Sequence, residues 1–485
     1  MSTTEVPAAA GDAAAATTTR PPTTRPSGGA FRALALRLHF YAGLFVGPFL
    51  LIAAVTGGLY AVSPAIESFV NRDLLYVDSQ GPDRPLAEQV NAGVATRPDL
   101  SLVAVSPAPA PGETTRVLFS DPTLGESERR AVFVDPATAR PVGESVVYGS
   151  SGALPFRAWV SQIHRHLHLG DPGRLYSELA ASWLWLIALA GLALWIRRVF
   201  ARRQRNSAGR LFVPNVARTH RERRLNWHAV VGVWILPVAL LLSVTGLTWS
   251  TYAGENIEHL RENLSWTTPV IDTALPGAAA PADSGHADHH AGHTAIHTVP
   301  ADRIRQLDRV LAVARDAGVT QPAEISVPAA DGIAFEVKER RLPGTLTVDS
   351  VAVDGPTGTI TARLPYADWP FMAKMANWGI QLHMGLMFGL LNQLLLLAAA
   401  IGLVTVIVRG YLMWWARRPA GASGVLAVGK PPRRGALRRS AALAVPAVAA
   451  AALIGWFAPV FGLSLLAFLL VDLLIGVLRR GRPAV

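Results

Sequence analysis

The chain carries the same run of apolar segments twice, and this duplication constrains its fold more than any other feature. One apolar stretch begins at His39 and another at His228, and the residues that follow them match at equal intervals. The matches are Gly43 with Gly232, Pro48 with Pro237, Thr56 with Thr245, and Gly57 with Gly246. A second pair of segments repeats in the same way, with His164, Gly170 and Gly191 in the first and His383, Gly389 and Gly410 in the second. Such repetition predicts a pseudo-symmetric helical bundle with a site where the repeats meet.

The apolar runs are long enough to cross a lipid bilayer, because roughly 20 helical residues span about 30 Å of hydrocarbon. They predict six spanning helices, over residues 38–63, 175–198, 228–250, 383–408, 440–457 and 459–478. The last two could instead form one kinked helix, but the stretch 441–478 is too long for a single crossing and has basic residues on both flanks. We therefore expect a helical hairpin with its tip near Pro459.

Arginine placement predicts the orientation of the chain. Arginines crowd the loops 199–227 and 409–439 and the tail after residue 478. Because short, positively charged loops stay in the cytoplasm, both termini are expected there. The formal net charge of +11 lies mostly in these flanks, so it indicates membrane topology and anionic-lipid contact, and not nucleic-acid binding.

Two further features narrow the possible chemistry. Residues 1–30 are rich in Ala, Thr and Pro and should be disordered, and the apolar stretch that follows them is too long for a cleavable signal, so it should act as an anchor. The chain has no cysteine, which excludes disulfides, iron–sulfur clusters, thiol catalysis and covalently attached haem. Any haem would be held by histidine alone.

The segments 64–160 and 251–375 are polar and long enough for small folded modules outside the membrane. Each contains short alternating runs bounded by turn sequences, which predict strands, and residues 303–317 have the apolar spacing of a helix. The predicted fold class is therefore a mainly α membrane protein. It consists of a four-helix bundle made from a duplicated helix pair, a C-terminal helical hairpin, and two small α+β modules outside the membrane.

Four histidines in duplicated register are candidate cofactor ligands. His39 and His228 are predicted at the cytoplasmic ends of their helices, and His164 and His383 at the outer ends of theirs. Neutral imidazole is a usual axial ligand of haem iron, and two haems, one in each leaflet, would form an electron path across the membrane. Small residues such as Gly43, Gly232 and Gly385 would give a flat macrocycle room, or would let the helices pack closely without a cofactor. A single interfacial histidine is otherwise most simply a polar residue at the level of the lipid headgroups.

The outer ligand in the first repeat is ambiguous, because His166 and His168 lie close to His164. The long-range glycine register favours His164, whereas the local match of HLG at His168 to HMG at His383 favours His168. A continuous helix would place His164 and His168 on one face, a turn apart. Either could be a ligand, and the other could contact a substrate.

Three other features invite a functional interpretation. A histidine-rich outer loop over 286–297 could collect divalent metals or be a solvated linker; its histidines are His286, His289, His290, His293 and His297. Trp378, near His383, could shield a haem, although an aromatic belt at the membrane boundary is the simpler interpretation. Asp472 lies deep in a predicted span, where a carboxylate costs about 2.5–3.5 kcal/mol on insertion scales. It therefore has a hydrogen-bonding partner on a neighbouring helix, lies nearer the membrane interface than the span suggests, or has a proton-linked role.

The motifs of several enzyme classes are missing from the sequence. It contains no Walker loop, nucleophile elbow, HExxH motif or dinucleotide fingerprint after a strand. We therefore expect no NAD(P)H or flavin domain in this chain and no general acid or base. Electrons would have to come from quinol or from a separate reductase.

Four segments resemble the PepSY-associated transmembrane family. They are LRLHFYAGLFVGPFLLIAAVTGGLY, IHRHLHLGDPGRLY, WHAVVGVWILPVALLLSVTGL and WGIQLHMGLMFGLLNQLLLL, and the resemblance covers roughly residues 32–418. The outer modules look like degenerate PepSY units. The family includes bacterial inner-membrane ferric-siderophore reductases that hold b-type haem in a four-helix bundle, and also members without an assigned activity. The resemblance implies a location in the bacterial cytoplasmic membrane and a role in iron uptake.

Two functions of different classes follow from these observations. The first is a b-type-haem oxidoreductase that passes electrons to a ferric siderophore or another ferric chelate outside, with His39 and His228 on the inner haem and His164 and His383 on the outer one. The second is a haem-free PepSY scaffold or sensor that binds a peptidase, a peptide or a metal such as copper. In the second case the four histidines are interfacial and the histidine-rich loop is the true metal ligand.

Overall fold

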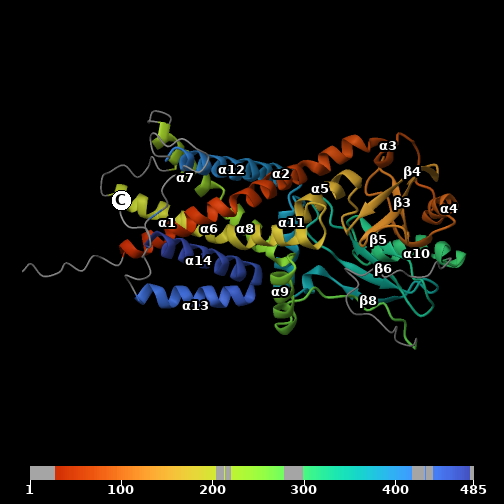
Figure 1. The fold of residues 1–485 in the computed structure, drawn as a ribbon. Helices are drawn as coiled ribbons and strands as arrows, with labels where there is room; N and C mark the ends of the chain where they lie inside the picture. The colour runs from red at the N-terminus through yellow and green to blue at the C-terminus, as the bar shows by residue number, and fades with distance from the viewer. Residues whose placement is uncertain are drawn as a thin grey trace, which may run out of the picture.

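Apolar helices form one end of the molecule and an antiparallel sheet forms the other (Figure 1). The computed structural model describes residues 28–203, 212–213, 220–277, 299–417, 432 and 441–480. Within these residues, three helices are long and apolar enough to cross a membrane: α2 (Gly47–Val70), the Asp171–Ala201 part of α6 (Asp171–Arg203), and α12 (Leu390–Trp415). A fourth span would consist of α7 (His220–Trp234) and α8 (Leu236–Thr248), which are bent by 59° at their junction. The chain is therefore a membrane protein.

Prolines divide the first helical segment of each repeat at the same place. Helix α1 (Gly28–Phe45) ends just before α2, and Pro48 stands in the first turn of α2. In the second repeat, α7 ends just before α8, and Pro237 stands in the first turn of α8. Proline lacks a backbone N–H, so it fits the first turn of a helix and interrupts an existing one. The predicted segments 38–63 and 228–250 are thus each two helices.

The outer histidines do not lie on the long helices, which corrects the expectation that four spanning helices carry the four histidines. His164 lies near the end of the short helix α5 (Pro155–His166), and His383 is the last residue of α11 (Phe371–His383). Residues with positive φ separate these helices from α6 and α12, and they are Leu167, His168 and Gly170 in the first repeat and Gly385 and Gly389 in the second. A left-handed residue ends a helix and turns the chain.

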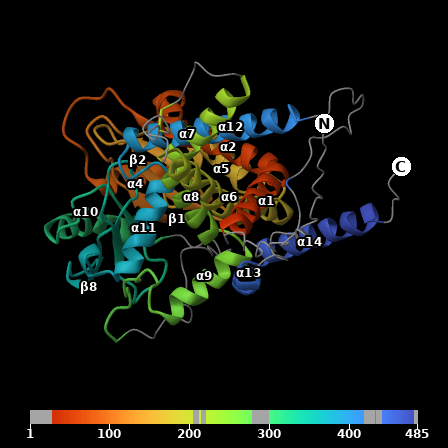
Figure 2. The same ribbon diagram turned by 90° about the vertical axis from the view of Figure 1, so that its left-hand side faces the viewer.

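The last two helices form an antiparallel pair. Helices α13 (Ala441–Phe457) and α14 (Pro459–Arg480) pack against each other, with Gly455 beside Gly462, and lie on the opposite side of the bundle from α12 (Figures 1 and 2). Their apolar parts, Ala444–Phe457 and Pro459–Leu474, are shorter than the other spans. The Trp183 indole N–H on α6 donates to the Ser464 hydroxyl over 2.9 Å. This bond fixes the pair to the bundle.

The two expected outer modules share one continuous sheet. Its strands are β1 (Ser101–Ser106), β2 (Thr115–Ser120), β3 (Glu128–Asp135), β4 (Arg140–Tyr148), β5 (Ala323–Ser326), β6 (Phe335–Glu339), β7 (Ser350–Val353) and β8 (Ile360–Leu364). Their order is β4-β3-β2-β1-β5-β6-β7-β8, and every neighbouring pair is antiparallel. The join is the pairing of β1 with β5, which sets Ala104 opposite Ser326 and Val105 opposite Ile325. Two four-stranded meanders thus meet at equivalent first strands.

A helix precedes each meander and covers the same face of the joined sheet. These helices are α4 (Leu86–Thr96) and α10 (Ala301–Asp316), the latter at the position where the sequence predicts a helix. Val90 of α4 and Leu307 of α10 are fully buried against strand residues such as Val117 and Ile325. At about 25 cal/mol per Å² of apolar surface, such burial is the main stabilising contribution to this region.

Short helices connect the sheet to the bundle. They are α3 (Arg72–Leu75), α5, α9 (Tyr252–Asn263), α11 and the 3₁₀ turn η2 (Tyr366–Asp368). Leu154, which precedes α5, packs with Phe133 and Val147 on the sheet face opposite α4, and Leu74 of α3 packs against the same cluster. Helices α5 and α11 therefore hold His164 and His383 between the sheet and the long helices (Figure 1).

Candidate functional site: two histidine pairs

The inner pair joins the first helices of the two repeats. The ring centroids of His39 on α1 and His228 on α7 are 5.8 Å apart, and the ring planes are inclined by 84°. Each ring is held by a long helix of its own repeat: His39 Nδ1 lies 2.9 Å from the Ile187 carbonyl oxygen of α6, and His228 Nδ1 lies 2.9 Å from the Val406 carbonyl oxygen of α12. The two contacts are equivalent under the repeat.

The outer pair has the same construction with different partners. The ring centroids of His164 and His383 are 6.4 Å apart, with planes inclined by 64°. His164 Nδ1 lies 2.9 Å from the Thr56 hydroxyl of α2, and His383 Nδ1 lies 2.6 Å from the Thr245 hydroxyl of α8. Each repeat therefore contributes one histidine to each pair and supports both of its histidines with its own residues.

These contacts determine which ring nitrogen carries the proton. A carbonyl oxygen only accepts, so Nδ1 of His39 and His228 must be the donor. The Thr56 hydroxyl already donates to the Ile52 carbonyl over 2.8 Å, and the Thr245 hydroxyl donates to the Leu241 carbonyl over 2.7 Å, so both hydroxyls accept from histidine. In neutral imidazole the other nitrogen is then unprotonated. All four histidines thus retain a free lone pair on Nε2, the atom that can bind a metal.

Glycines give the imidazole rings their space. A Cβ on Gly57 would lie 3.0 Å from Cε1 of His164, and a Cβ on Gly191 would lie 3.0 Å from Cε1 of His39. The repeat-related positions Gly246 and Gly410 face His383 and His228 at 4.0 and 3.8 Å. The close approach of a histidine ring to the neighbouring helix therefore explains Gly57 and Gly191, and their repeat-related glycines face the equivalent rings at ordinary contact distance.

The three glycines expected beside a macrocycle divide into two kinds. A Cβ on Gly43 would meet nothing within 4 Å, and one on Gly232 would meet only Val406, at 4.0 Å. Close helix packing therefore does not explain the glycines one turn after His39 and His228. Gly385 is instead a turn residue with a φ of 76°, where a side chain would be strained.

The donor set fits a metal that needs two protein ligands. The ring centroids of each pair, 5.8 and 6.4 Å apart, are close enough for both imidazoles to bind one metal ion through bonds of about 2 Å. Within the described residues there is no group of three or more His, Cys, Asp or Glu side chains that could hold a metal, whereas a zinc site needs three or four protein ligands. A haem supplies four nitrogens itself and needs only axial ligands. The two pairs fit haem better than a bare ion.

A comparison with protein families assigns the chain. The model of the PepSY-associated TM region matches residues 36–417. The chain belongs to this family. A comparison with curated proteins gives no match. The family match includes both histidine pairs and the sheet and ends before α13, so the hairpin of α13 and α14 lies outside the part that defines the PepSY-associated TM region.

An aromatic residue contacts the outer pair of this PepSY-associated TM protein, but it is not the tryptophan that the sequence suggested. Trp249 lies with its ring centroid 5.1 Å from that of His383, whereas Trp378 packs near Tyr366 at 6.4 Å. Trp249 occupies the position equivalent to Tyr60 in the first repeat. This pair of equivalent aromatic residues was the signal from which Trp249 could have been found.

The structure brings only one of the three neighbouring histidines to His383. Helix α5 ends at His166, and Leu167 and His168 both have a φ of 54°, so the expected continuous helix through His168 is wrong. His168 is exposed, with Nε2 3.2 Å from the Trp159 carbonyl oxygen. Nδ1 of His166 is buried without a hydrogen-bond partner among the described residues. His164 is therefore the residue that pairs with His383.

Two candidates from the sequence remain, Asp472 and the histidine-rich tract. Asp472 on α14 forms an ion pair with Arg37 on α1, with an N–O distance of 3.1 Å, so the carboxylate has the partner on a neighbouring helix that the sequence called for. The histidine-rich tract, with His286, His289, His290, His293 and His297, lies outside the described residues.

Proposed function

We propose that this PepSY-associated TM protein is a b-type-haem oxidoreductase that passes electrons across the membrane to a ferric chelate, most simply a ferric siderophore. The observation that carries the proposal is the state of the four histidines: they face each other in two pairs, and every Nδ1 is hydrogen-bonded so that every Nε2 is free. Outer partners that fix a tautomer in this way are typical of metal-binding histidines.

In this proposal the protein's own residues hold and orient two haems. His39 and His228 would hold the inner haem, and His164 and His383 would hold the outer one. Bound haem supplies reversible one-electron chemistry at its iron. The carbonyl oxygens of Ile187 and Val406 keep the inner rings from rotating, and the hydroxyls of Thr56 and Thr245 do so at the outer level.

The two levels lie along the same helices, which suits transfer between them. Thr56, which supports the outer ring of His164, lies 17 positions after His39. At 1.5 Å per helical residue, the two levels are at most about 25 Å apart along α1 and α2. The basic residues at the end of α6 and the start of α7 lie beyond the inner pair, and the sheet lies beyond the outer pair. We therefore infer that this end of the bundle faces the bacterial cytoplasm, with both termini, and that the sheet is outside.

Transfer of one electron to the acceptor would release its iron. Siderophore oxygen donors are hard ligands that bind ferric iron more strongly than ferrous iron, so reduction weakens the chelate. The electron would come from quinol or from a separate reductase, because the sequence has no dinucleotide fingerprint. No proton transfer by the protein is required.

The test is an absorbance spectrum of the purified, detergent-solubilised protein, recorded reduced minus oxidised, with pyridine extraction to count haem per chain. We expect two b-type haems. A protein that contains none after expression with ample haem would overturn the proposal and favour the haem-free scaffold or sensor, whose metal binding should disappear on deletion of residues 286–297.

A further inference from the structure

Arginines gather where the sheet meets the membrane helices. Two lie on strands, one on α5, and two directly after β6; they are Arg116, Arg129, Arg157, Arg340 and Arg341. A cavity of about 440 Å³ lies among them and is lined by Arg116, Arg157 and Arg341. This arginine cluster takes no part in holding the histidine pairs.

Only some of this charge is neutralised by carboxylates. Arg129 makes a two-pronged contact with Glu324, at 2.8 and 3.2 Å. Arg157 lies 3.3 Å from Glu67, whose carboxylate also accepts from the Leu154 N–H over 2.8 Å. These contacts account for two of the arginines.

The rest of the cluster has a positive excess. In the described part of the chain, five arginines face the carboxylates of Glu67, Glu113 and Glu324, and Glu339 accepts from the N–H of Gln321 in the cavity wall, which leaves one positive charge. Arg116 donates to the Gly152 carbonyl over 3.1 Å. Arg340 is buried, and its Nε has no hydrogen-bond partner among the described residues. Buried charge without a partner is costly, so the excess indicates an anion.

Arg116 and Arg340 converge on one point. Nitrogen atoms of the two guanidinium groups lie 2.9 and 3.0 Å from the position of a Cβ on Gly152. Burial, and then the charge of Arg340, lower the pKa of Arg116 to about 9. Burial also raises the pKa of the nearby Glu113. Two guanidinium groups held this close form a fork for an oxyanion.

We propose that the cavity binds an anionic ferric chelate through carboxylate groups on the chelate, which contact Arg116 in the cavity wall. Arg340 lies behind this wall and adds its positive charge beside Arg116. The proposal rests on the proposed function and names the substrate class. A volume of about 440 Å³ is within the range of about 300–1,000 Å³ that small-molecule sites occupy. Guanidinium recognises carboxylate by two parallel hydrogen bonds.

The cavity lies next to the outer histidine pair. Arg157 and His164 are seven residues apart on α5, or about 10 Å along the helix. Leu386, which also lines the cavity, follows His383 by three residues. A chelate seated here would receive one electron per iron, from the donor named above, and its ferric ion would become ferrous without any bond to the protein being made or broken.

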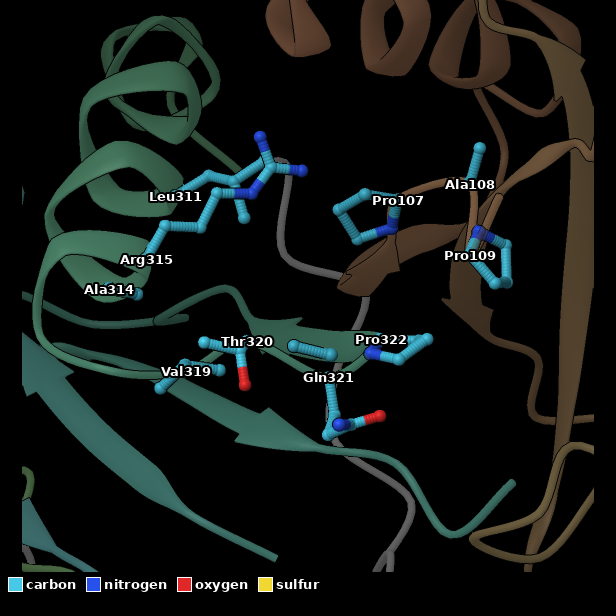
Figure 3. Close-up of a pocket in the computed structure, with 11 residues that line it drawn as sticks. Pro107, Ala108, Pro109, Leu311, Ala314, Arg315, Val319, Thr320, Gln321 and Pro322 are labelled. Atoms are coloured by element: carbon cyan, nitrogen blue, oxygen red, sulfur yellow. The ribbon is translucent and has the colours of Figure 1, made fainter. Parts of the chain in front are cut away.

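A second, smaller hollow is a weaker candidate for this ligand. It has a volume of about 100 Å³, lies between α10 and the residues after β1, and shares Pro109, Gln321 and Pro322 with the larger cavity (Figure 3). Arg315 is the charged residue among its described lining residues. The larger cavity therefore carries the proposal.

The experiment uses gallium(III) citrate, because gallium(III) has the charge of ferric iron and is not reduced under these conditions, so binding is measured without electron transfer. Isothermal titration of the full chain in detergent should show binding of this probe. Arg116→Gln should weaken it about tenfold or more, since it removes charge-assisted hydrogen bonds. Arg340→Gln should weaken it less, since it removes only the neighbouring charge. Arg97→Gln, which removes a surface arginine that pairs with Asp99, should leave it unchanged.

A second variant, Arg116→Lys, tests whether Arg116→Gln loses binding only because it fails to fold. It keeps the charge and removes the fork, so it should weaken binding less than Arg116→Gln while circular dichroism shows an intact fold. Wild-type affinity in all three variants would overturn the proposal, as would equal affinity of the wild type for a neutral gallium(III) tris-hydroxamate. A protein that binds phosphatidylglycerol but not gallium citrate would indicate a site for a lipid phosphate. This result would also overturn the proposal.

The outcome is independent of haem content. Citrate binding in a protein without haem would contradict the proposed function and leave the cavity as an anion site. Two haems with no citrate binding would support the proposed function and overturn the assignment of the cavity.

Discussion

His228 is the single residue that best separates the two haem levels. Its ring belongs to the inner pair, and its Nδ1 contact with Val406 is independent of the outer level. We expect His228→Ala to remove one haem of two and to halve the reduced-minus-oxidised signal, with extracted haem counted per chain. His259→Ala is the control, because that side chain is 64% exposed on α9 and should keep both haems. A full haem complement in His228→Ala would rule out the inner assignment.

Thr245 tests the supporting contacts. Thr245→Val keeps the shape of the side chain but removes the hydroxyl that accepts from His383 at 2.6 Å. Loss of such an outer partner typically lowers metal affinity about 10–100-fold, so the outer haem should pass to an excess of a haem-scavenging protein about tenfold faster or more, as followed by absorbance.

Thr96→Val is the matched control for this change. Thr96 also donates to the carbonyl four residues earlier, over 3.1 Å, but it lies on the surface of α4. Haem should be lost from this variant at the wild-type rate. Equal rates in Thr96→Val and Thr245→Val would show that the hydroxyl does not support the ligand.

At the scale of elements, one ion pair fastens the α13–α14 pair to the bundle. Arg37 of α1 and Asp472 of α14 are 13% and 25% exposed. Breaking a fully buried pair costs about 3–5 kcal/mol, and this partly exposed one should cost less, so Asp472→Asn should lower the thermal midpoint by several degrees. The double change Arg37→Gln with Asp472→Asn should recover part of the loss.

An exposed pair provides the comparison. Glu88→Gln breaks the contact of Arg84 with Glu88, whose side chains are 56% and 47% exposed, and should change the midpoint little because surface pairs contribute about 0–1 kcal/mol. Thermal midpoints of Asp472→Asn and Glu88→Gln that both equal the wild-type value would show that the Arg37–Asp472 ion pair does not stabilise the bundle.

The elements also show how far the sequence could lead. Equal spacing in the two repeats was enough to pair His39 with His228, because duplicated helices place equivalent residues at equivalent depths. For His383 the long-range spacing favoured His164, but the local match to His168 left the choice open until the structure showed where α5 ends. The break after His383 was missed because the apolar run through Met387 hides the left-handed glycines Gly385 and Gly389. Hydrophobicity alone does not report where φ changes sign.

The joining of the outer modules could not be predicted at all. Alternating residues identify β1 and β5 as strands, but which edge pairs with which depends on contacts between segments more than 200 residues apart. The arginine cluster could not be predicted for the same reason, since Arg116 and Arg340 come together only when the two meanders pair.

At the scale of the whole molecule, the β1–β5 join can be tested by cross-linking. The Val327 N–H donates to the Val103 carbonyl, so the next pair, Ala104 with Ser326, is a non-hydrogen-bonded pair with Cα atoms about 4.5 Å apart, within disulfide reach. Since the chain has no cysteine, Ala104→Cys with Ser326→Cys should form one disulfide on mild oxidation. Ala104→Cys with Ser350→Cys should form none, as measured by electrophoretic mobility after cleavage between the modules.

The support of each histidine by its own repeat has a consequence for how the protein is put together. Among the described residues, the hydrogen-bond partners of His39 and His164 lie between residues 28 and 203, and those of His228 and His383 lie between residues 220 and 417. The halves meet through equivalent rings and equivalent strands, which is the geometry of an isologous two-fold dimer. One half alone would therefore present two well-oriented ligands with nothing opposite them, and the chain is in effect a dimer whose subunits can no longer separate.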